Sequence, residues 1–301
     1  MELVECVPNF SEGRRPDVIA AIRLAAESAG AWVLDVHSDA AHNRSVLTLA
    51  GADSTVLEAA FRCVQTAAAL IDLRQHRGEH PRIGATDVVP FVPLGETPME
   101  RCVELARELG QRMGEELDIP VYLYAEAASR PERRWLPTIR RGEYEALVHE
   151  IETHAGRAPD FGPARLSPAG ATAVGARPFL VAYNVNLRSS NLAIAADIAR
   201  RVRQSTGGLL AVQARAMRTA DPRVTQVSMN LLDISATPAH VVFNRIEELA
   251  SAANVEVIGA ELVGLMPMAM STSAAAAALG LPGLRPGDAV EYRLLQALFE
   301  R

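Results

Sequence analysis

The sequence predicts a mixed α/β (α+β) protein made of two ferredoxin-like subdomains, each a split β-α-β unit, related to one another by duplication. A chain of 301 residues has room for one large or two medium domains. The order strand-helix-strand-strand-helix-strand can be traced in both halves, and it is the order of the split β-α-β unit. The opening strand of each half ends in asparagine before a helix, at Asn9 and at Asn186. We therefore predict subdomains at 1–177 and 178–301.

Apolar periodicity and turn residues give the predicted elements of the first half. The first helix should bury one face, formed by Val18, Ile19, Ile22, Leu24, Ala25 and Ala26. The segment 37–42 is expected to be a polar connection between strands. The predicted elements are a strand at 3–8, a helix at 16–29, strands at 32–36 and 44–50, a helix from a cap at Asp53 or Ser54 to 73, a strand at 87–93, a helix at 99–117, a strand at 119–124 and a helix at 143–153.

The segment 154–177 is dominated by Gly, Pro and Ala, and we expect it to be an ordered connection between the two subdomains. In the second half, alternation within 224–234 predicts Gln226, Ser228 and Asn230 on one side of a strand. The apolar segment 262–281 contains Pro267, so we expect a buried loop and helix rather than a membrane span. The other predicted elements are strands at 179–187, 209–217 and 255–263, a helix capped by Ser190 or Asn191 and reaching 204, and a helix at 238–252.

Composition restricts the partners and the compartment. The net charge is -6 and no basic run stands apart from acidic neighbours, which argues against nucleic acid as the partner. The N-terminus lacks the basic and apolar regions of a signal peptide. Cys6, Cys63 and Cys102 are odd in number and lie in apolar surroundings, as reduced core thiols do. We expect a cytoplasmic protein that is neither inserted in a membrane nor bound to nucleic acid.

The most informative stretch is Arg74–Asp87, which places histidines, arginines and acids between two apolar segments. Gly78 and Pro81 oppose helix formation, so the stretch is predicted to be a loop outside the core. His80 is the candidate acid-base group, because imidazole titrates near neutral pH. The alternative for His80 is a surface histidine that only hydrogen-bonds a neighbour.

Polar clusters also follow two other apolar strands, at Asn9–Glu12 and at His37–Arg44. The split β-α-β topology could bring these strand ends and the His80 loop to one edge. His42 and Arg44 would then lie within reach of His80 in one cleft.

A carboxylate beside His80 would orient its imidazole and stabilise its cation. Asp39 and Glu79 are the candidates, and Asp39 is favoured because Glu79 is the immediate neighbour of His80. Arg44 and Arg82 would either clamp substrate carboxylates in bidentate fashion or form salt bridges that stabilise the fold.

Three other kinds of site are disfavoured. His76 and His80 have the spacing of two zinc ligands on a helix, but Gly78 and Pro81 interrupt that helix, and no metal is expected. Gly207-Gly208 lacks the following Lys-Ser/Thr of a phosphate loop, and no dinucleotide fingerprint is present. The chain also has no nucleophile elbow.

With these motifs in place, the chain resembles the formiminotransferase family, enzymes that move a formimino group from N-formimino-L-glutamate to tetrahydrofolate in histidine breakdown. The matching segments are collinear and span nearly the whole chain. They are Leu3–Gly13, His42–Arg44, Gly78–Arg82, Gly84–Asp87, Gly142–Glu145, Ala158–Pro163, Val174–Arg177, Asn184–Leu187 and Gln226–Asn230.

The resemblance implies that His80 is the catalytic histidine and that the loop from Gly162 to Gly170 contacts folate. It also implies two ferredoxin-like subdomains with a substrate cleft between them, a homodimer, tetrahydrofolate as the acceptor co-substrate, and a stand-alone form without a cyclodeaminase. The predicted substrate- or folate-binding residues are Asn9, His42, Arg44, Arg82, Gly162, Pro163, Gly170, Asn184 and Asn186.

Three departures from the family pattern lie in the second half. Met268-Ala269-Met270 replaces a lysine-containing segment, Leu209-Leu210 lacks the basic residues common there, and Arg215-Ala216 stands where Ile/Met-Gly is common. They bear on the donor and on folate binding. The alternatives are therefore a transferase that uses formiminoglycine or formylglutamate, or a folate-binding relative without catalysis.

Overall fold

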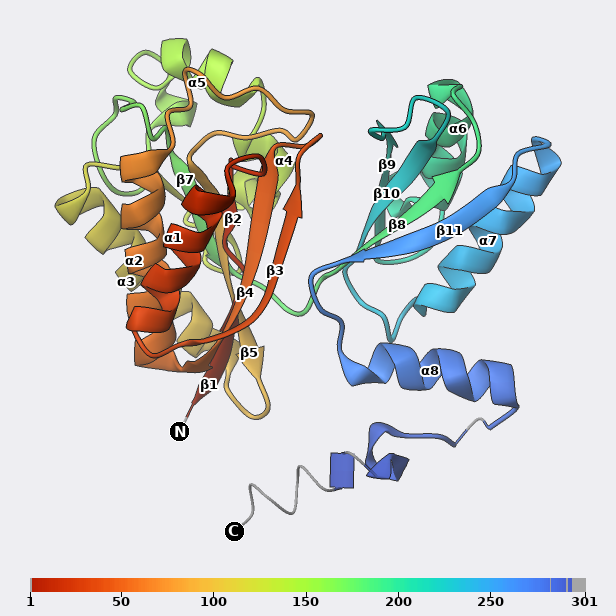
Figure 1. Cartoon of the computed structure of the whole chain (residues 1–301). Coiled ribbons are helices and arrows are strands. Elements are labelled where there is room, and N and C mark those ends of the chain that lie inside the picture. Colours follow the sequence, from red (N-terminus) through yellow and green to blue (C-terminus); the bar gives the residue numbers. More distant parts are fainter. Residues whose placement is uncertain (1, 282, 291, 294–301) are drawn as a thin grey trace. The chain divides into compact units, whose positions relative to one another are not determined.

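The computed structural model describes residues 2–281, 283–290 and 292–293, and it divides into two compact units, Met1–Pro178 and Phe179–Arg301. Each unit contains its own sheet with helices packed on it (Figure 1). The protein is thus a mixed α/β chain with two sheets, and each unit is described by itself below.

The sheet of the first unit has seven strands in the order β3-β4-(β1, β2)-β5-β7-β6. β5–β7 and β7–β6 are parallel pairs, and the other pairs are antiparallel. The predicted strand at 3–8 is β1, which ends at Cys6. β2 lies beyond it and is separated from it by Val7 and Pro8, which has no amide hydrogen to donate. The strands are β1 (Leu3–Cys6), β2 (Asn9–Phe10), β3 (Trp32–Asp39), β4 (Arg44–Ala52), β5 (Thr86–Leu94), β6 (Val121–Ala125) and β7 (Thr172–Ala176).

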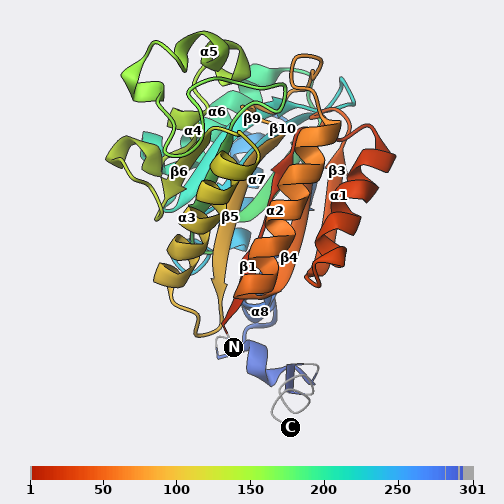
Figure 2. The same cartoon turned by 90° about the vertical axis from the view of Figure 1, so that its left-hand side faces the viewer.

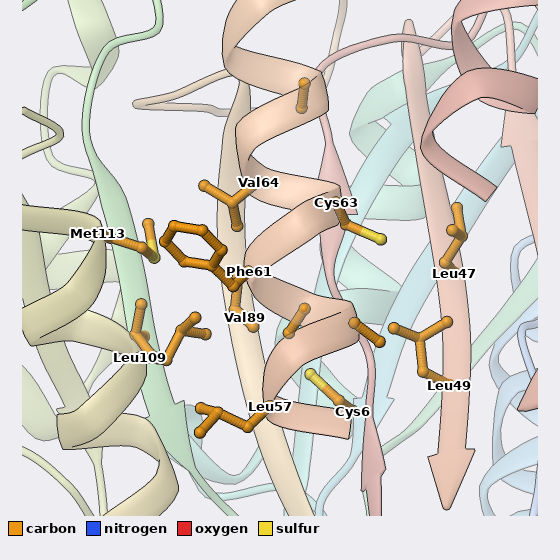
Figure 3. Close-up of a cluster of buried hydrophobic side chains, with 14 of the residues drawn as sticks. Cys6, Leu47, Leu49, Leu57, Phe61, Cys63, Val64, Val89, Leu109 and Met113 are labelled. Atoms are coloured by element: carbon orange, nitrogen blue, oxygen red, sulfur yellow. The ribbon is translucent and has the colours of Figure 1, made fainter. Parts of the chain in front are cut away.

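Three long helices cover one face of this sheet (Figure 2). They are α1 (Pro16–Ser28), α2 (Asp53–Leu70) and α3 (Met99–Glu116), and the shorter α4 (Leu136–Ile139) and α5 (Glu143–Glu150) follow β6. Figure 3 shows their core, where Phe61 of α2 lies near Met113 and Leu109 of α3. The buried residues of α1 are Val18, Ile22 and Ala26. The predicted apolar face is therefore wrong at Leu24, which is 63% exposed.

Two predictions for the first unit are corrected. The segment 154–177 is not a connection between subdomains, because it contains β7, a fully buried strand between β5 and β6. Its small residues had suggested a loop. At Gly175 a small residue is required within the strand, because the ring of Tyr124 leaves no room for a side chain. The expected polar connection at 37–42 is partly strand, since β3 pairs with β4 up to Asp39 opposite Arg44.

The second unit has four strands in the order β11-β8-β10-β9, and every neighbouring pair is antiparallel. α6 (Leu192–Val202) and α7 (Ala239–Ala252) pack on one face, over Val227, Met229 and Leu231. Gln226, Ser228 and Asn230 alternate with these core residues, as predicted. The strands are β8 (Val181–Leu187), β9 (Val212–Arg218), β10 (Thr225–Leu231) and β11 (Val257–Val263).

Of the predicted helix caps, one holds and one does not. Asn191 caps α6, with its Oδ1 accepting from the backbone N of Ala193 at 3.0 Å. Asp53 is instead the first residue of α2, and Ala52 occupies the cap position.

The apolar segment near the C-terminus forms α8 (Met268–Leu279), but none of its residues is buried in the described part of the chain. The expectation of a buried helix is therefore wrong. α8 contacts α7, but the small Ala, Ser and Thr side chains of α8 offer little apolar surface for α7 to bury. Among the described residues, no helix has the length and apolar character to cross a bilayer.

The three cysteines are free and buried, as predicted. Burial raises the pKa of Cys63 to about 12 and that of Cys102 to about 11, so both stay protonated at neutral pH. Protonated thiols are poor nucleophiles, which agrees with a packing role.

Candidate active site

His80 lies on the segment between α2 and β5, which forms no helix, as Gly78 and Pro81 predicted. Glu79 is exposed and His80 is half-buried. The expectation that this whole loop stays out of the core is wrong for two side chains. His76 and Arg82 are buried, because each finds hydrogen-bond partners inside the protein.

Asn43 joins the three polar clusters. Its side-chain oxygen accepts from the backbone N of Gly13 at 2.9 Å, and its Nδ2 donates to the carbonyl of Arg77 at 3.1 Å. Its own carbonyl accepts from Nε2 of His76 at 2.9 Å. The segment after β2, the β3–β4 turn and the His80 loop therefore meet at one side chain. The convergence expected from topology is confirmed for these three segments.

Two glycines allow this close approach. A Cβ at Gly13 would collide with the carbonyl oxygen of Asp39, and a Cβ at Gly78 would collide with that of His42. The backbone N of Glu79 also donates to the carbonyl of Ala41, at 3.4 Å. The glycines of the two motifs are thus explained by backbone packing between segments.

Arg82 is held by two glutamates of α5. Its Nη1 donates to Glu143 at 2.9 Å, and both Nη atoms donate to Glu145, at 2.7 and 2.6 Å. Its Nε donates to Nδ1 of His76 at 3.2 Å, and the side chain is 6% exposed. These contacts engage four of the five N–H donors of Arg82, and its role as a clamp on a substrate carboxylate stays a prediction. The alternative, a salt bridge that stabilises the fold, is what the structure contains.

His76 is neutral in this arrangement. Nε2 donates to the Asn43 carbonyl, so Nδ1 carries the lone pair that accepts from Arg82. Burial, with the positive charge of Arg82 adding to it, lowers the pKa of His76 below its ordinary value. His76 was considered above only as a metal ligand, but it is a structural link between the β3–β4 turn and Arg82.

Both carboxylate oxygens of Asp39 are engaged by His42. Nδ1 of His42 donates to Oδ2 at 2.8 Å, and the backbone N of His42 donates to Oδ1 at 2.8 Å. The side-chain hydrogen bond from His42 is the main reason that the pKa of Asp39 lies well below its usual range. Asp39 therefore orients His42, whereas the sequence had favoured it as the partner of His80.

The first strand-end cluster is occupied by structural contacts. Buried Glu12 accepts from the backbone N atoms of Arg14 and Arg15, each at 2.9 Å. Nδ2 of Asn9 donates to the carbonyl of Val7 at 2.9 Å, which stabilises the break between β1 and β2. Ser11 donates through Oγ to the carbonyl of Gly84 at 2.7 Å. This cluster therefore fastens the start of α1 to the far end of the His80 loop.

The predicted folate loop, Gly162–Gly170, is fastened at both ends. Before it, Asp160 pairs with buried Arg133 at 2.7 Å, and a Cβ at Gly162 would collide with the Ile119 carbonyl. Pro163 follows and is half-buried. At the other end, the backbone N of Ala85 donates to the carbonyl of Ala169 at 2.7 Å, and Gly170 bridges to Gly84. The loop therefore ends beside the His80 loop, although the sequences lie far apart.

In the second unit, a layer of amide groups lies on the sheet face opposite the apolar core. Gln226 donates through Nε2 to Asn186 Oδ1 at 2.9 Å and to Glu261 Oε2 at 3.2 Å. Asn184 faces Glu261 on one side and Ser228 on the other in the strand register. Arg215 is the register partner of Ser228 on β9. The two predicted asparagines thus belong to one polar face that also carries Arg215.

Several residues of these clusters were missed by the sequence analysis as candidates. Asn43, Glu143 and Glu145 were quoted only as parts of motifs, and Gln226 and Glu261 received no role. The available signal was pairing between motifs: an acidic Gly-Glu-Tyr-Glu segment can neutralise an arginine of a separate basic loop. Among the residues that the structure describes, no group of three or more His, Cys, Asp and Glu could hold a metal ion.

Comparison with known proteins places these motifs in a family. The model of the formiminotransferase domain, N-terminal subdomain, matches residues 3–177, and that of the formiminotransferase domain matches residues 182–279. A glutamate formimidoyltransferase of Thermoplasma acidophilum is 46% identical over 300 residues, which are 99% of each chain. One of Streptococcus pyogenes serotype M1 is 44% identical, with 88% of this chain and 89% of that protein covered.

A fused relative shows the same likeness over part of its length. The formimidoyltransferase-cyclodeaminase of Mus musculus is 45% identical over 282 residues. The match covers 91% of this chain and 52% of that protein, so the chain spans about half of the fused enzyme. On the two matching models and the nearly full-length relative, the chain belongs to the formiminotransferase domain family.

Proposed function

We propose that this chain is a glutamate formimidoyltransferase, which transfers the formimino group of N-formimino-L-glutamate to N5 of tetrahydrofolate. The products are 5-formiminotetrahydrofolate and glutamate. The observation that carries the proposal is the convergence of three polar segments at Asn43, which holds the His80 loop against the β3–β4 turn. The near full-length likeness to a glutamate formimidoyltransferase supports the same reaction.

The chemistry requires proton transfer at two nitrogens. N5 of tetrahydrofolate attacks the formamidine carbon, which is largely cationic at neutral pH. The resulting tetrahedral carbon bears both nitrogens, and the N5 proton must be removed and the glutamate nitrogen protonated before glutamate leaves. We assign the proton acceptor to His80, whose pKa as a free imidazole is near the working pH. Such acid-base help contributes roughly 10²–10⁴-fold in rate.

The acceptor is proposed to contact two further regions. The loop Gly162–Gly170 ends against Ile83 and Gly84, so a pterin held there would lie near the His80 segment in the first unit. The polar face with Asn184 and Asn186 offers amide donors and acceptors suited to a heteroaromatic ring. Arg44 is kept as a candidate for a substrate carboxylate.

We also propose that both units are ferredoxin-like and arose by duplication. The orders β5-(β1, β2)-β4-β3 and β11-β8-β10-β9 correspond strand for strand when each unit is numbered from its first strand. The first unit then adds β7 and β6 beside β5. The substrate cleft, the homodimer and the cytoplasmic location stay predictions of the sequence and of the family resemblance.

The test is a steady-state assay with purified protein, tetrahydrofolate and N-formimino-L-glutamate. Acid converts the product to a methenyl form that absorbs in the near ultraviolet. We expect turnover by the wild type and a loss of about 10²-fold or more in His80→Ala. His154→Ala is the matched control, because His154 is exposed and lies outside the three segments.

The outcomes separate the alternatives. Turnover with formiminoglycine or formylglutamate, and none with formiminoglutamate, would change the donor but keep the reaction type. Folate binding without turnover of any donor would indicate a relative that does not catalyse. If His80→Ala keeps wild-type turnover, the assignment of the acid-base group to His80 is wrong.

A further inference from the structure

We propose that His42, held by Asp39, is a second acid-base group of the transfer reaction and protonates the departing glutamate nitrogen. This inference rests on the proposed function and deepens it, because it gives separate groups to the two proton transfers. It also gives Asp39 a role different from the predicted one of orienting His80.

The geometry of the pair fixes the imidazole. Asp39 is the last residue of β3 and stands opposite Arg44 in the ladder, so its backbone is anchored by the sheet. Its carboxylate accepts from the side chain and from the backbone N of His42, each at 2.8 Å. Two bonds from one carboxylate to one residue fix both the position and the ring orientation of His42, in the way that a triad carboxylate holds its histidine.

The turn that carries His42 is itself held in place. Asn43 follows with φ of +49°, a conformation that asparagine tolerates better than most residues. Its bonds to Gly13 and Arg77 tie the turn to two other segments. A side chain that acts on reacting atoms must be held in place by its surroundings, and these bonds restrain the turn that carries His42.

The same contacts bring His42 beside the loop of His80. The carbonyl oxygen of His42 lies so close to Gly78 that a Cβ there would collide with it. The backbone N of Glu79 donates to the carbonyl oxygen of Ala41. One residue, Glu79, separates Gly78 from His80 along the chain. Two imidazoles are therefore presented by adjoining backbone segments of one unit.

The chemistry of the ring suits proton transfer. With the Nδ1 hydrogen donated to Asp39, Nε2 carries the ring lone pair and is the basic atom. The side chain is 12% exposed, so the ring is mostly enclosed but not sealed. Asp39 stays ionised across the working range, because the hydrogen bond from His42 keeps the pKa of Asp39 low. It can therefore stabilise the imidazolium form of His42.

The proposed step balances without any other reactant. The bond from N5 to the formimino carbon forms, and the N5 proton passes to Nε2 or Nδ1 of His80. The bond from that carbon to the glutamate nitrogen then breaks, and this nitrogen takes the Nε2 proton of the His42 imidazolium. The two histidines end in exchanged protonation states, which proton exchange with water restores.

The experiment compares His42→Gln and Asp39→Asn with the wild type in the full chain. His37→Gln is the matched control, because it is the same substitution on β3, the strand that leads into this turn, and lies outside the pair. We expect His42→Gln to lower kcat on the order of 10²-fold with little change in either KM. We expect its pH profile of kcat to lose one of the two limbs of the wild type. Charged or titratable residues that contact this turn include Arg14, Arg44, His76, Arg77 and Glu79, and they are unchanged in every variant.

Asp39→Asn supplies a readout independent of turnover. An asparagine amide in that place would donate to Nδ1 and remove the lone pair from Nε2. NMR of the His42 ring nitrogens should show the proton on Nδ1 in the wild type and on Nε2 in Asp39→Asn, and kcat should fall with this change. Thermal unfolding of each variant checks that the fold is kept.

The results that would overturn the inference are distinct. A wild-type kcat and pH profile in His42→Gln would exclude a proton-transfer role. A loss that raises KM and leaves both limbs of the pH profile would assign His42 to binding or structure. If the wild type itself does not turn over formiminoglutamate, the proposed function fails, and the position of the ring proton of His42 in the wild type and in Asp39→Asn still decides whether the pair exists.

Discussion

Arg82 shows, at the scale of one residue, that a charged side chain near a candidate site can be engaged by the protein's own groups. Its charge and its place two residues after His80 suited a substrate clamp, but Glu143, Glu145 and His76 occupy its donors. An arginine in a loop motif and a pair of glutamates in a helix motif can both be read from the sequence. That they form one cluster depends on the fold, because 61 residues separate Arg82 from Glu143.

Arg82→Met should lower the free energy of unfolding by about 1–3 kcal/mol. It leaves a neutral histidine nitrogen and two carboxylates without their donor, although Glu145, being 60% exposed, regains water. Urea denaturation measures the change. Arg74→Met is the control, since its pair with Asp72 is exposed, and it should stay within about 1 kcal/mol of the wild type. Equal effects of the two substitutions would contradict the buried network.

His76 predicts a pH dependence of stability. Its pKa in the folded state lies below the ordinary value of 6.5, so the unfolded chain binds the extra proton more readily. The contribution is complete above about pH 6.5 and is lost as the pH falls from there toward the folded value. His76→Gln should flatten the decline in unfolding free energy between about pH 7 and 5, measured by urea denaturation. The low pKa of Asp39 acts in the same direction but at lower pH, below about 4, where carboxylates protonate. An unaltered slope in His76→Gln would show that another group titrates.

At the scale of elements, the strong hydrophobic patterns were predicted well and the exceptions share a cause. β7 has small residues because it lies between two parallel strands, with the Tyr124 ring pressed on Gly175. β3 carries polar residues to its end because it pairs on one side only, so side chains there reach water. In both cases pairing with neighbouring strands, and not local composition, determined that the segment forms a strand.

The segments of the candidate site are held together through glycine, and this can be tested at Gly78. Gly78→Ala should push the His80 loop away from the His42 carbonyl and lower kcat, with a stability loss of about 1–3 kcal/mol. Gly156→Ala is the matched control, because its added methyl group would meet no atom within 4 Å. The assay and thermal unfolding measure both effects. Wild-type kcat in Gly78→Ala would mean that the contact does not position the loop.

At the scale of the whole molecule, each unit has its own apolar core and can unfold as a unit. Both tryptophans, Trp32 and Trp135, and all three cysteines lie in the first unit. Fluorescence and thiol reactivity therefore report on that unit, whereas circular dichroism reports on both. The second core is the smaller, so it should be the less stable.

In a urea titration we expect circular dichroism to change first, before tryptophan fluorescence and before the thiols react. The buried thiols should react only once the first core opens. Identical transition midpoints for all three signals would show instead that the chain unfolds as one cooperative body.

The sequence by itself determined the order of helices and strands apart from β7, the absence of a helix in the His80 segment, the buried cysteines and the family. These follow from local rules, because periodicity, Gly and Pro act on neighbouring residues. Only the tertiary structure decided that Asp39 bonds to His42, that Arg82 forms ion pairs with glutamates of α5, and that the loop at Gly170 ends beside Gly84. The physical reason is that a hydrogen bond depends on distances of about 3 Å between groups far apart in the chain, and composition carries no such distance.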